Sequence, residues 1–383
     1  MKYDVIVVGA GLAGCSAVIQ LAQQGLQVLL LEQARYPVHR LCGEFLSVEV
    51  IAVFERLGVL ETVRQAGAHP MQRTYLTAAS GASFRSELPG TALGLSRYQL
   101  DRILFERSQS VGATCRDGTT VREIAGNLQE GFAVSTNQGE FLGRMVIGAY
   151  GKRSSLDRNL RRPFVDVRSP WVACKAHYEG IDLSGAIELH AFPGGYCGFS
   201  QIESGRINAC WIAHERVLTS AASADERICP PALFQNPILA ERLRSMHRIS
   251  PSQSLSQISF AIKNKFDRDL LMIGDAGGMI TPLCGDGMAM ALRSAELAVP
   301  FAVRFLENGL MDFKHQYEAA WTQEFKARLQ LGRLIHNGFI QPHLASMGIK
   351  ACNLIPALGN WIIRSTRGKS VVEAAPAIAP SLS

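Results

Sequence analysis

The sequence lacks most of the features that mark membrane-spanning, metal-binding or nucleic-acid-binding chains. No uninterrupted apolar run reaches the roughly 18 residues expected of a membrane span. The nine cysteines form no C-x-x-C pair, and no histidine, cysteine and acidic residues have metal-ligand spacing. Charged residues make up only 19% of the chain, and its 39 basic and 33 acidic residues are scattered. We therefore expect no metal site and no nucleic-acid partner.

Signs of secretion are missing as well. No signal peptide precedes Tyr3, where a strand is expected to begin. An odd number of unpaired cysteines suits reduced thiols rather than a disulfide framework, so a cytoplasmic protein is expected. The length of 383 residues, with 47% hydrophobic residues, allows two or three domains around a large core.

The first 33 residues have the pattern of a dinucleotide-binding β-α-β unit. A buried strand is expected over Tyr3–Val8, a helix over Leu12–Leu21 and a second strand over Gln27–Leu31. The turn after the first strand reads G-x-G-x-x-G. Its glycines allow a tight turn, a close approach to a pyrophosphate and close helix–strand packing. The residues predicted to bind the cofactor here are Gly9, Ala10, Gly11, Ala13, Gly14, Glu32 and Gln33.

The acid at the end of the second strand narrows the choice of nucleotide. Glu32 can accept hydrogen bonds from a free ribose diol, so this site suits FAD or NAD rather than NADP. A second stretch, 269–306, reads as a short strand, a glycine-rich loop and a long helix. Its aspartate suits a ribityl hydroxyl, and its backbone N–H groups and helix dipole suit a flavin ring edge. Further cofactor-binding residues predicted here are Gly274, Asp275, Gly285, Gly287 and Met288.

With these motifs the chain resembles the FAD-dependent oxidoreductases that share the fold of p-hydroxybenzoate hydroxylase, and among them the geranylgeranyl reductase branch. The 274–287 loop is similar to that branch's Gly-Asp-Ala-Ala-Gly…Pro-Leu…Gly-x-Gly loop. Arg97, in "LSRYQLDRILFERSQSVGA", resembles the family arginine that reaches the FAD phosphates. "GGYCGFSQIESGRINACWIA" (194–213) resembles the branch's sheet segment that faces the substrate cavity. The resemblance covers residues 1 to about 310 and implies FAD.

The expected fold is α/β, a Rossmann-type FAD-binding domain with an inserted, mostly antiparallel substrate domain and a C-terminal helical region. Apolar and polar residues alternate around Val172–Tyr178, Ile187–Phe192 and Ile207–Ile212, which predicts a sheet with one buried face. His177 and His190 lie in these segments and read as sheet residues rather than bases. The predicted domains are 1–70, 98–160 and 266–310 (FAD-binding), 71–97 and 161–265 (substrate) and 311–383 (helical cap).

One segment departs from the family pattern. The family usually has an Asp-Gly followed by Ser and Arg, thought to serve both FAD and the nicotinamide nucleotide. In "VIGAYGKRSSLDR" (146–158), Tyr150 replaces the aspartate, while Gly151, Ser154 and Arg158 remain. A tyrosine cannot supply the fixed negative charge. NADPH or NADH is still the expected reductant.

The stretch "RLCGEFLS" (40–47) is similar to the reductases' Pro…Lys-x-Cys-Gly-Gly segment. The resemblance implies that Gly43 lets the backbone pass close to the flavin, so Gly43 joins the cofactor-binding residues. Cys42 and Glu44 are the predicted catalytic residues, with Cys42 orienting or protonating the substrate. The alternatives are a small packed thiol at a tight turn and an acid that complements a helix N-terminus.

The leading hypothesis for function is an FAD-dependent oxidoreductase that reduces a C=C bond of an isoprenoid or other lipophilic substrate. The alternative is an NAD(P)H- and FAD-dependent monooxygenase that hydroxylates an aromatic or polyketide-like substrate, because the fold serves both chemistries. A non-enzymatic flavin sensor is a third class. The apolar and basic segment 339–370 suits peripheral contact with a membrane, closure over an apolar substrate, or a cap that packs on the core.

Overall fold

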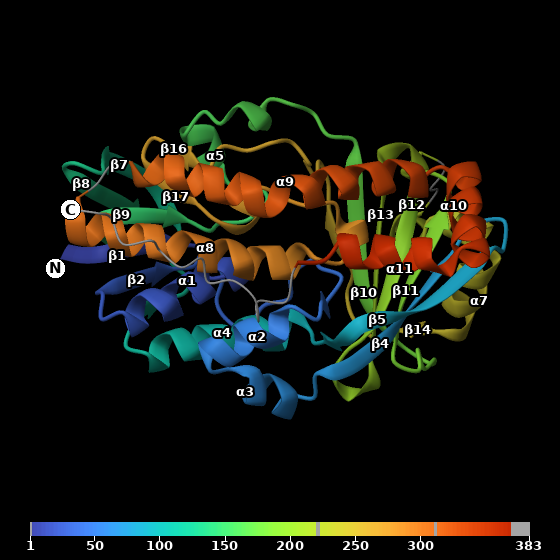
Figure 1. Ribbon diagram of the computed structural model, residues 1–383. Coiled ribbons are helices and arrows are strands. Elements are labelled where there is room, and N and C mark those ends of the chain that lie inside the picture. Colours follow the sequence, from blue (N-terminus) through green and yellow to red (C-terminus); the bar gives the residue numbers. More distant parts are fainter. Residues whose placement is uncertain (1, 220–222, 310–311, 369–383) are drawn as a thin grey trace.

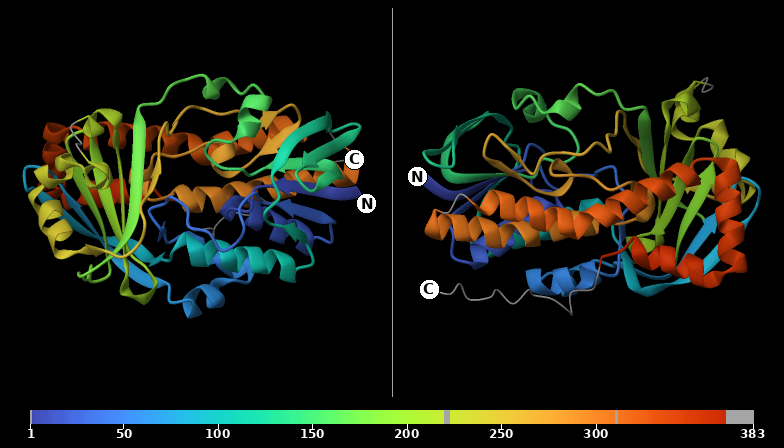
Figure 2. Two further views of the ribbon diagram at one scale, coloured as in Figure 1. Left: turned by 180° about the vertical axis from the view of Figure 1, so that it is seen from behind. Right: turned by 45° about the horizontal axis from the view of Figure 1, so that its top comes forward.

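The computed structural model describes residues 2–219, 223–309 and 312–368. Within these ranges the chain forms two β-sheets, which lie at opposite ends of the molecule (Figure 1). The long helices α8 (Gly287–Asn308) and α9 (Phe313–Phe339) pack against each other and run lengthwise between the two ends (Figures 1 and 2). One face of the sheet at the C-terminal-helix end therefore lies opposite the strand ends and turns of the other sheet (Figure 1).

Sheet A contains the parallel core that the dinucleotide motif predicts. Its central strands run in the order β17-β9-β1-β2-β6, and each neighbouring pair is parallel. β1, β2, β17 and the second half of β9 are apolar and mostly buried, as expected of a parallel sheet covered by helices, whereas β6 at the edge is mostly exposed. The strands of sheet A are β1 (Lys2–Val8), β2 (Val28–Leu31), β6 (Thr114–Arg116), β7 (Val121–Asn127), β8 (Gly131–Thr136), β9 (Gly139–Gly148), β16 (Phe266–Asp267) and β17 (Leu270–Met272).

Sheet B is mostly antiparallel, with the single β11–β4 pair parallel among its described pairings. The order is β14-β10-β13-β12-β11-β4-β5-β3, and β15 pairs with β10. Most of its strands come from the ranges predicted for the substrate domain, although β3 comes from the range predicted for the FAD-binding domain. The strands of sheet B are β3 (Phe45–Leu46), β4 (His69–Thr77), β5 (Ser83–Gly94), β10 (Trp171–Glu179), β11 (Ala186–Phe192), β12 (Gly195–Gln201), β13 (Ile207–His214), β14 (His247–Arg248) and β15 (Gln253–Leu255).

The prediction that sheet B has one buried face is wrong, because both faces are covered. All residues of β10 from Val172 to His177 are buried. On one face, Ala173 and Ile212 pack towards Phe339 of α9. On the other face, side chains such as Trp211 pack under α7 and the preceding turn. Each face is covered by segments that follow later in the chain. The alternation of polar and apolar residues within a strand therefore does not indicate this burial.

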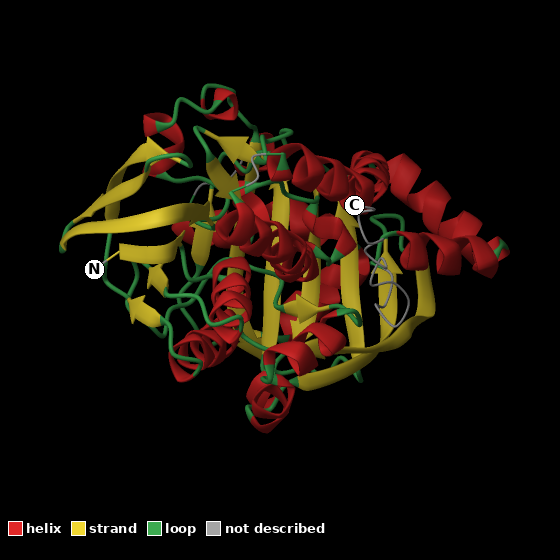
Figure 3. Ribbon diagram, turned by 60° about the vertical axis from the view of Figure 1, so that its left-hand side comes forward, coloured by secondary structure: helices red, strands yellow, loops and turns green. Residues whose placement is uncertain are grey.

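Helices surround sheet A and close the far end of sheet B. Helix α1 is buried between sheet A and helices α4 and α8, whereas α10 and α11 form an outer layer at the end of the molecule far from the N-terminus (Figures 1 and 3). The described part of the predicted cap is helical, while residues 311 and 369–383 lie outside the described residues. The α-helices are α1 (Leu12–Gln23), α2 (Val50–Leu57), α3 (Leu60–Gln65), α4 (Arg97–Ser110), α5 (Ser155–Asn159), α6 (Ala224–Ile228), α7 (Pro237–Ser245), α8 (Gly287–Asn308), α9 (Phe313–Phe339), α10 (Pro342–Leu354) and α11 (Pro356–Ser365).

Short 3₁₀ turns join several of these elements, and two of them, η5 and η6, belong to the glycine-rich loop before α8. Among the described helices, none combines the length and the apolar character that crossing a bilayer requires. The 3₁₀ turns are η1 (Pro163–Val165), η2 (Glu203–Gly205), η3 (Glu215–Leu218), η4 (Pro231–Gln235), η5 (Gly274–Ala276) and η6 (Pro282–Cys284).

Candidate active site

A cavity of about 820 Å³ lies between sheets A and B. One end is formed by the turn after β1 and the N-terminus of α1. The other end is formed by strands of sheet B and by α9 and α11. Every site residue predicted from the sequence lines this cavity, except Ala10 and Gly14. One continuous space therefore joins the predicted nucleotide site to the inner face of sheet B.

The glycine turn after β1 has the geometry that its sequence predicts. Gly9 has a φ of 103°, and a Cβ there would lie 2.5 Å from the carbonyl oxygen of Ala149. A Cβ on Gly14 would lie 1.9 Å from the carbonyl oxygen of Gly9, so helix and strand approach closely. At Gly11 the nearest atom to such a Cβ belongs to the Arg97 guanidinium, 3.8 Å away. The first turn of α1 has no acidic residue, so its free N–H groups and dipole favour an anion.

Arg97 is the first residue of α4 and lies beside this turn. Its Nε is 2.6 Å from Oδ1 of Asp101, one helical turn further on. Burial by itself would lower the pKa of Arg97, but the Asp101 carboxylate reverses this and raises it. Arg40 donates to the other oxygen of Asp101 at 3.1 Å. Two ordered cations therefore stand near the turn where a diphosphate is expected.

Glu32 directly follows β2, and its carboxylate is already part of a network. It accepts the backbone N–H groups of Ala10 and Ala34, each at 2.9 Å, and pairs with Arg40 at 3.1 Å. A carboxylate has about four lone-pair sites, so one remains for a ribose hydroxyl. Ala10 does not line the cavity; its N–H fixes the Glu32 side chain instead.

Two glycines, Gly43 and Gly287, form the far side of the nucleotide site. Neither the backbone conformation nor the packing of the described residues requires a glycine at these positions. Neither Gly43 nor Gly287 has a positive φ, and a Cβ on either would meet no atom within 4 Å. Both line the cavity, so their missing side chains leave room for a ligand. Gly287 also begins α8, whose N-cap residue makes no capping bond with its side chain. Free N–H groups of α8 therefore point towards this space.

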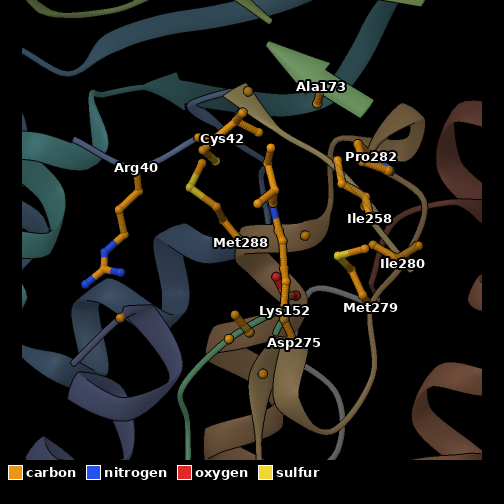
Figure 4. Close-up of a pocket in the computed structure, with 18 of the residues that line it drawn as sticks. Arg40, Cys42, Lys152, Ala173, Ile258, Asp275, Met279, Ile280, Pro282 and Met288 are labelled. Carbon is orange, nitrogen blue, oxygen red and sulfur yellow. The ribbon is translucent and has the colours of Figure 1, made fainter. Parts of the chain in front are cut away.

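The carboxylate of Asp275 has no hydrogen-bond partner among the described residues and lies on the cavity wall, as Figure 4 shows. It is free to accept a hydroxyl of a bound sugar alcohol. In the same view Met288 and Cys42 are drawn on one side of the cavity, and Met279 and Ile280 on the other. The donors and acceptors along the cavity fit FAD, with its diphosphate at α1 and Arg97, a ribose at Glu32, and the flavin edge at Gly43 and Gly287.

The turn that carries Cys42 is attached to sheet B through its carbonyl groups. Asn208 donates to the carbonyl oxygen of Cys42 at 3.2 Å, and Ser200 donates to that of Gly43 at 2.6 Å. The Cys42 sulfur accepts the backbone N–H of Glu44 at 3.4 Å. The thiol is half-buried at the cavity wall, at the boundary between the nucleotide site and sheet B.

Glu44 is buried and joins three elements. Its carboxylate accepts Nε2 of His177 at 2.7 Å, the ammonium of Lys175, and the backbone N–H of Arg97 at 2.8 Å. Burial by itself would raise the pKa of Glu44, but the His177 hydrogen bond and the Lys175 charge hold it below its usual range. The Arg97 N–H begins α4, so the carboxylate also complements a helix N-terminus. The catalytic role of Glu44 stays a prediction.

The backbone at Glu44 has a φ of 54°, in the left-handed region that a non-glycine residue seldom adopts. Such a conformation costs about 1–3 kcal/mol and persists only where its surroundings hold it. Here the ion pairs of the carboxylate hold it, and the result is a sharp bend that presents Gly43 and Cys42 to the cavity.

The loop that departs from the family pattern also lines the cavity. The Tyr150 hydroxyl lies 3.5 Å from the sulfur of Met272, and burial raises the pKa of the tyrosine. Lys152 extends into the cavity, and its ammonium makes no hydrogen bond or ion pair with the described residues (Figure 4). This loop therefore presents a buried tyrosine at position 150 and a cation two residues further on.

The sequence reasoning missed several residues that build the site. The sequence contained a signal for Asp101, because it follows Arg97 by four residues on an expected helix, the spacing at which two such side chains form an ion pair. The signal for Lys175 and His177 was weaker. They stand two positions apart, with one residue between them, and therefore share one face of a strand. The α11 residues Ile362 and Ile363 also line the cavity. They belong to segment 339–370, for which closure over an apolar substrate is one of the predicted alternatives, but that prediction singles out neither residue.

Comparison with known proteins places the chain among flavoproteins. The family described as "FAD binding domain" matches residues 2–304. A digeranylgeranylglycerophospholipid reductase 2 of Methanopyrus kandleri is 27% identical over 342 residues, 85% of this chain and 83% of the relative. A menaquinone reductase of Mycolicibacterium smegmatis is 26% identical over 352 residues, 85% of this chain and 82% of the relative.

Solved structures support the fold. The flavin-dependent brominase Bmp2 superposes with a TM-score of 0.81 at 19% identity, covering 96% of this chain and 93% of that one. PqsL, a probable FAD-dependent monooxygenase of Pseudomonas aeruginosa, superposes with a TM-score of 0.72 at 18% identity, covering 92% of this chain and 100% of that one. The α/β fold and the resemblance to the p-hydroxybenzoate hydroxylase-like flavoproteins are confirmed. The chain therefore belongs to the FAD-binding domain family and is an FAD-dependent oxidoreductase.

Proposed function

We propose that this protein reduces a carbon–carbon double bond of an isoprenoid or similarly lipophilic substrate, with NADPH or NADH as the source of electrons. The observation that carries the proposal is the composition of the cavity beyond Cys42. That chamber is lined mainly by apolar side chains from sheet B, from the loops before β16 and α8 and from the C-terminal helices, which suits a hydrocarbon. Its apolar residues include Leu76, Ile187, Leu189, Ile212, Leu255, Ile258, Met279, Ile280, Leu283, Ile335, Phe339, Ile362 and Ile363.

The curated relatives support this substrate class. Digeranylgeranylglycerophospholipid reductases and a menaquinone reductase are among them. Each matches more than four fifths of this chain, so the similarity includes the sheet that forms the chamber. A cytoplasmic location is part of the proposal and suits the free thiols of the eight cysteines whose side chains are described.

The proposed reaction adds a hydride to one alkene carbon and a proton to the other. Bound FAD, once reduced by the nicotinamide nucleotide, supplies the hydride. The Cys42 thiol donates the proton, and the S–H bond breaks as the new C–H bond forms. The resulting thiolate keeps the hydrogen bond from the Glu44 N–H and is reprotonated from solvent.

Glu44 acts as a positioning residue in this proposal. Its carboxylate holds the bend of the 42–44 turn through Lys175 and His177, and this bend directs the Cys42 sulfur to the cavity. The same carboxylate fixes the first N–H of α4, and so the start of the helix that presents Arg97. Loss of Glu44 would therefore disturb the proton donor and the phosphate site together.

A second function has one specific observation in its favour. Tyr196 and Phe339 line the chamber with ring centroids 6.1 Å apart, and His336 lies 5.8 Å from Tyr196. Such rings suit an aromatic substrate. The alternative is accordingly a monooxygenase that hydroxylates an aromatic or polyketide-like compound.

Product analysis separates the two reactions. The FAD-loaded protein is incubated anaerobically with NADPH and a geranylgeranyl lipid, and the lipid is examined by mass spectrometry. The proposal predicts products that have gained two hydrogens for each reduced double bond. An unchanged lipid, together with an oxygen-dependent product from an aromatic compound, would favour the monooxygenase.

A further inference from the structure

The C-terminal helices have an outer face that is unusually apolar for an exposed surface. Of the thirteen large hydrophobic side chains that the described residues leave exposed, seven lie between residues 334 and 361. Leu354 is 83% exposed, and Trp361 is 57% exposed. A gathering of this kind on consecutive helices marks an interaction surface rather than scattered exposure.

These side chains repeat with helical spacing. Met347, Lys350 and Leu354 follow one another along the outer side of α10. Leu358 and Trp361 continue along α11, followed by the exposed Arg364. The inner sides of both helices pack on the β4–β5 hairpin, where Asn353 donates to the carbonyl oxygen of Ser83 at 2.6 Å. The outer face is thus held rigidly and is not needed for internal packing.

The charges of this segment have one sign. No acidic residue occurs from Phe325 to Gly368, whereas Lys350 and Arg364 are exposed among the apolar side chains. An apolar helix face flanked by cations suits the boundary of a bilayer that contains anionic lipids. A soluble acidic partner would complement the positive charges, but it would not bury the exposed apolar side chains.

The same helices form part of the cavity wall. Ile362 and Ile363 of α11 line the chamber, only one residue beyond the exposed Trp361. On α9, Ile335 lines the chamber and its neighbour Leu334 is exposed. One helical layer therefore separates the apolar chamber from the apolar outer face, at the end of the molecule far from the N-terminus (Figures 1 and 3).

We propose that α10, α11 and the C-terminal end of α9 dock on an anionic lipid bilayer, with Leu354 and Trp361 inserted among the lipids and Lys350 and Arg364 at the headgroups. The docking proposal is inferred from the residues of this surface alone. Its consequence, that a lipophilic substrate passes from the bilayer into the chamber beneath α11, rests on the proposed function.

Co-sedimentation of the full-length, FAD-loaded protein with lipid vesicles tests the docking. The vesicles contain either phosphatidylcholine alone or phosphatidylcholine mixed with phosphatidylglycerol. The proposal predicts binding to the mixed vesicles that weakens with salt. The double variant L354Q/W361Q should bind at least about tenfold more weakly, since each insertion buries a large side chain. K350Q/R364Q should bind about fivefold more weakly for each charge on mixed vesicles, and equally on phosphatidylcholine.

The chain offers a matched control. Ile262 and Val167 are 82% and 58% exposed, as Leu354 and Trp361 are, but lie outside the C-terminal helices. V167Q/I262Q should bind like the wild type. Absent binding of the wild type, or equal loss in both double variants, would overturn the proposal. So would a dimer in light scattering that L354Q/W361Q abolishes, because a second copy would then cover the face.

Measuring enzyme turnover distinguishes a failure of the docking proposal from a failure of the proposed function. With a substrate dispersed in detergent, L354Q/W361Q should reduce double bonds at the wild-type rate, because neither side chain lines the cavity. A wild type that binds vesicles but reduces no lipid would contradict the proposed function and leave the docking in place. A wild type that reduces the lipid but binds no vesicle would contradict only the docking.

Discussion

Glu44 and His177 are joined by a 2.7 Å hydrogen bond across 133 residues of chain. Glu44 belongs to the turn beside the nucleotide site, and His177 lies on β10 of sheet B. The contact, with that of Lys175, attaches the Cys42 turn to the wall of the substrate chamber. The relative position of the cofactor site and the chamber therefore depends on one buried carboxylate.

Replacing Glu44 by glutamine should destabilise the protein. The change leaves Lys175 and His177 buried without their counter-ion, and breaking a buried pair in this way costs about 3–5 kcal/mol. Denaturation by guanidinium measures the loss. Glu188→Gln is the matched control, because Glu188 is also buried and bonded to His190 at 3.0 Å, but lies outside the cavity. Both variants should lose stability, and only Glu44→Gln should also lose double-bond reduction while folded.

Glu44 should also make stability depend on pH. Burial by itself would raise its pKa, but the His177 hydrogen bond and the Lys175 charge hold the folded-state pKa below the usual value of 4.5. The ionised carboxylate therefore contributes fully above pH 4.5, and its contribution is lost as the pH falls through the folded pKa. Below pH 4.5 the unfolding free energy of the wild type should fall more steeply than that of Glu44→Gln. Parallel curves for the two proteins would show that the Glu44 charge is not stabilising.

Cys42→Ser should slow the chemical step and spare the others. A serine keeps the size but is a far weaker proton donor, and general acid catalysis contributes about a hundredfold or more. Reduction of bound FAD by NADPH should stay unchanged, and reoxidation by the alkene should slow by about that factor. Cys210→Ser is the control, since Cys210 also lines the cavity and burial raises the pKa of its thiol to about 12. Equal slowing in both variants would remove Cys42 from the mechanism.

Gly43→Ala should weaken FAD binding without weakening the fold. A Cβ at this position meets no protein atom within 4 Å, and the backbone conformation suits any residue. The methyl group would instead occupy space that the cofactor needs. The melting temperature of the FAD-free protein should stay unchanged, while the Kd for FAD, from fluorescence titration, should rise at least about tenfold, which corresponds to about 1.4 kcal/mol. Gly348→Ala, in α10 and outside the cavity, should leave the Kd unchanged.

His336 should contribute a second pH dependence. It is buried among aromatic rings, neither ring nitrogen has a hydrogen-bond partner in the described part of the chain, and burial lowers its pKa from 6.5 to about 4. Its neutral form is favoured in the folded state, so stability should fall as the pH drops from 6.5 to 4. His336→Phe should reduce this loss by about 3 kcal/mol at pH 4. His315→Phe, at an exposed position of the same helix, should leave the pH dependence as it is.

The local parts of the site could be predicted from the sequence. The positive φ at Gly9, the contact of Gly14 with the carbonyl group of Gly9 and the bond from the Ala10 N–H to Glu32 all lie within the first β-α-β unit, although the turn also packs against Ala149. The loop before α8 is likewise recognisable from its own residues. Each has a backbone requirement that only certain residue types meet, so the motif carries its own structure.

The parts that join the two sheets could not be predicted in this way. Glu44 meets Lys175 and His177 from more than 130 residues away, and no spacing reports that contact. The strands of sheet B looked half-exposed because α7 and α9, which cover them, follow later in the chain. Burial on two faces is a tertiary property, whereas alternation within a strand is local. The apolar segment 339–370 allowed closure over an apolar substrate, but its own sequence does not indicate which side of α11 lines the chamber.

The central claim is that the reduced flavin of this protein gives its electrons to a carbon–carbon double bond. Stopped-flow spectroscopy tests it most directly. The protein is reduced by NADPH without oxygen and mixed with either a geranylgeranyl lipid or oxygenated buffer. The proposal predicts rapid flavin reoxidation by the lipid without oxygen, and slow reoxidation by oxygen in one featureless phase. No reaction with the lipid, and reoxidation by oxygen through a transient absorbance sharpened by an aromatic compound, would contradict it.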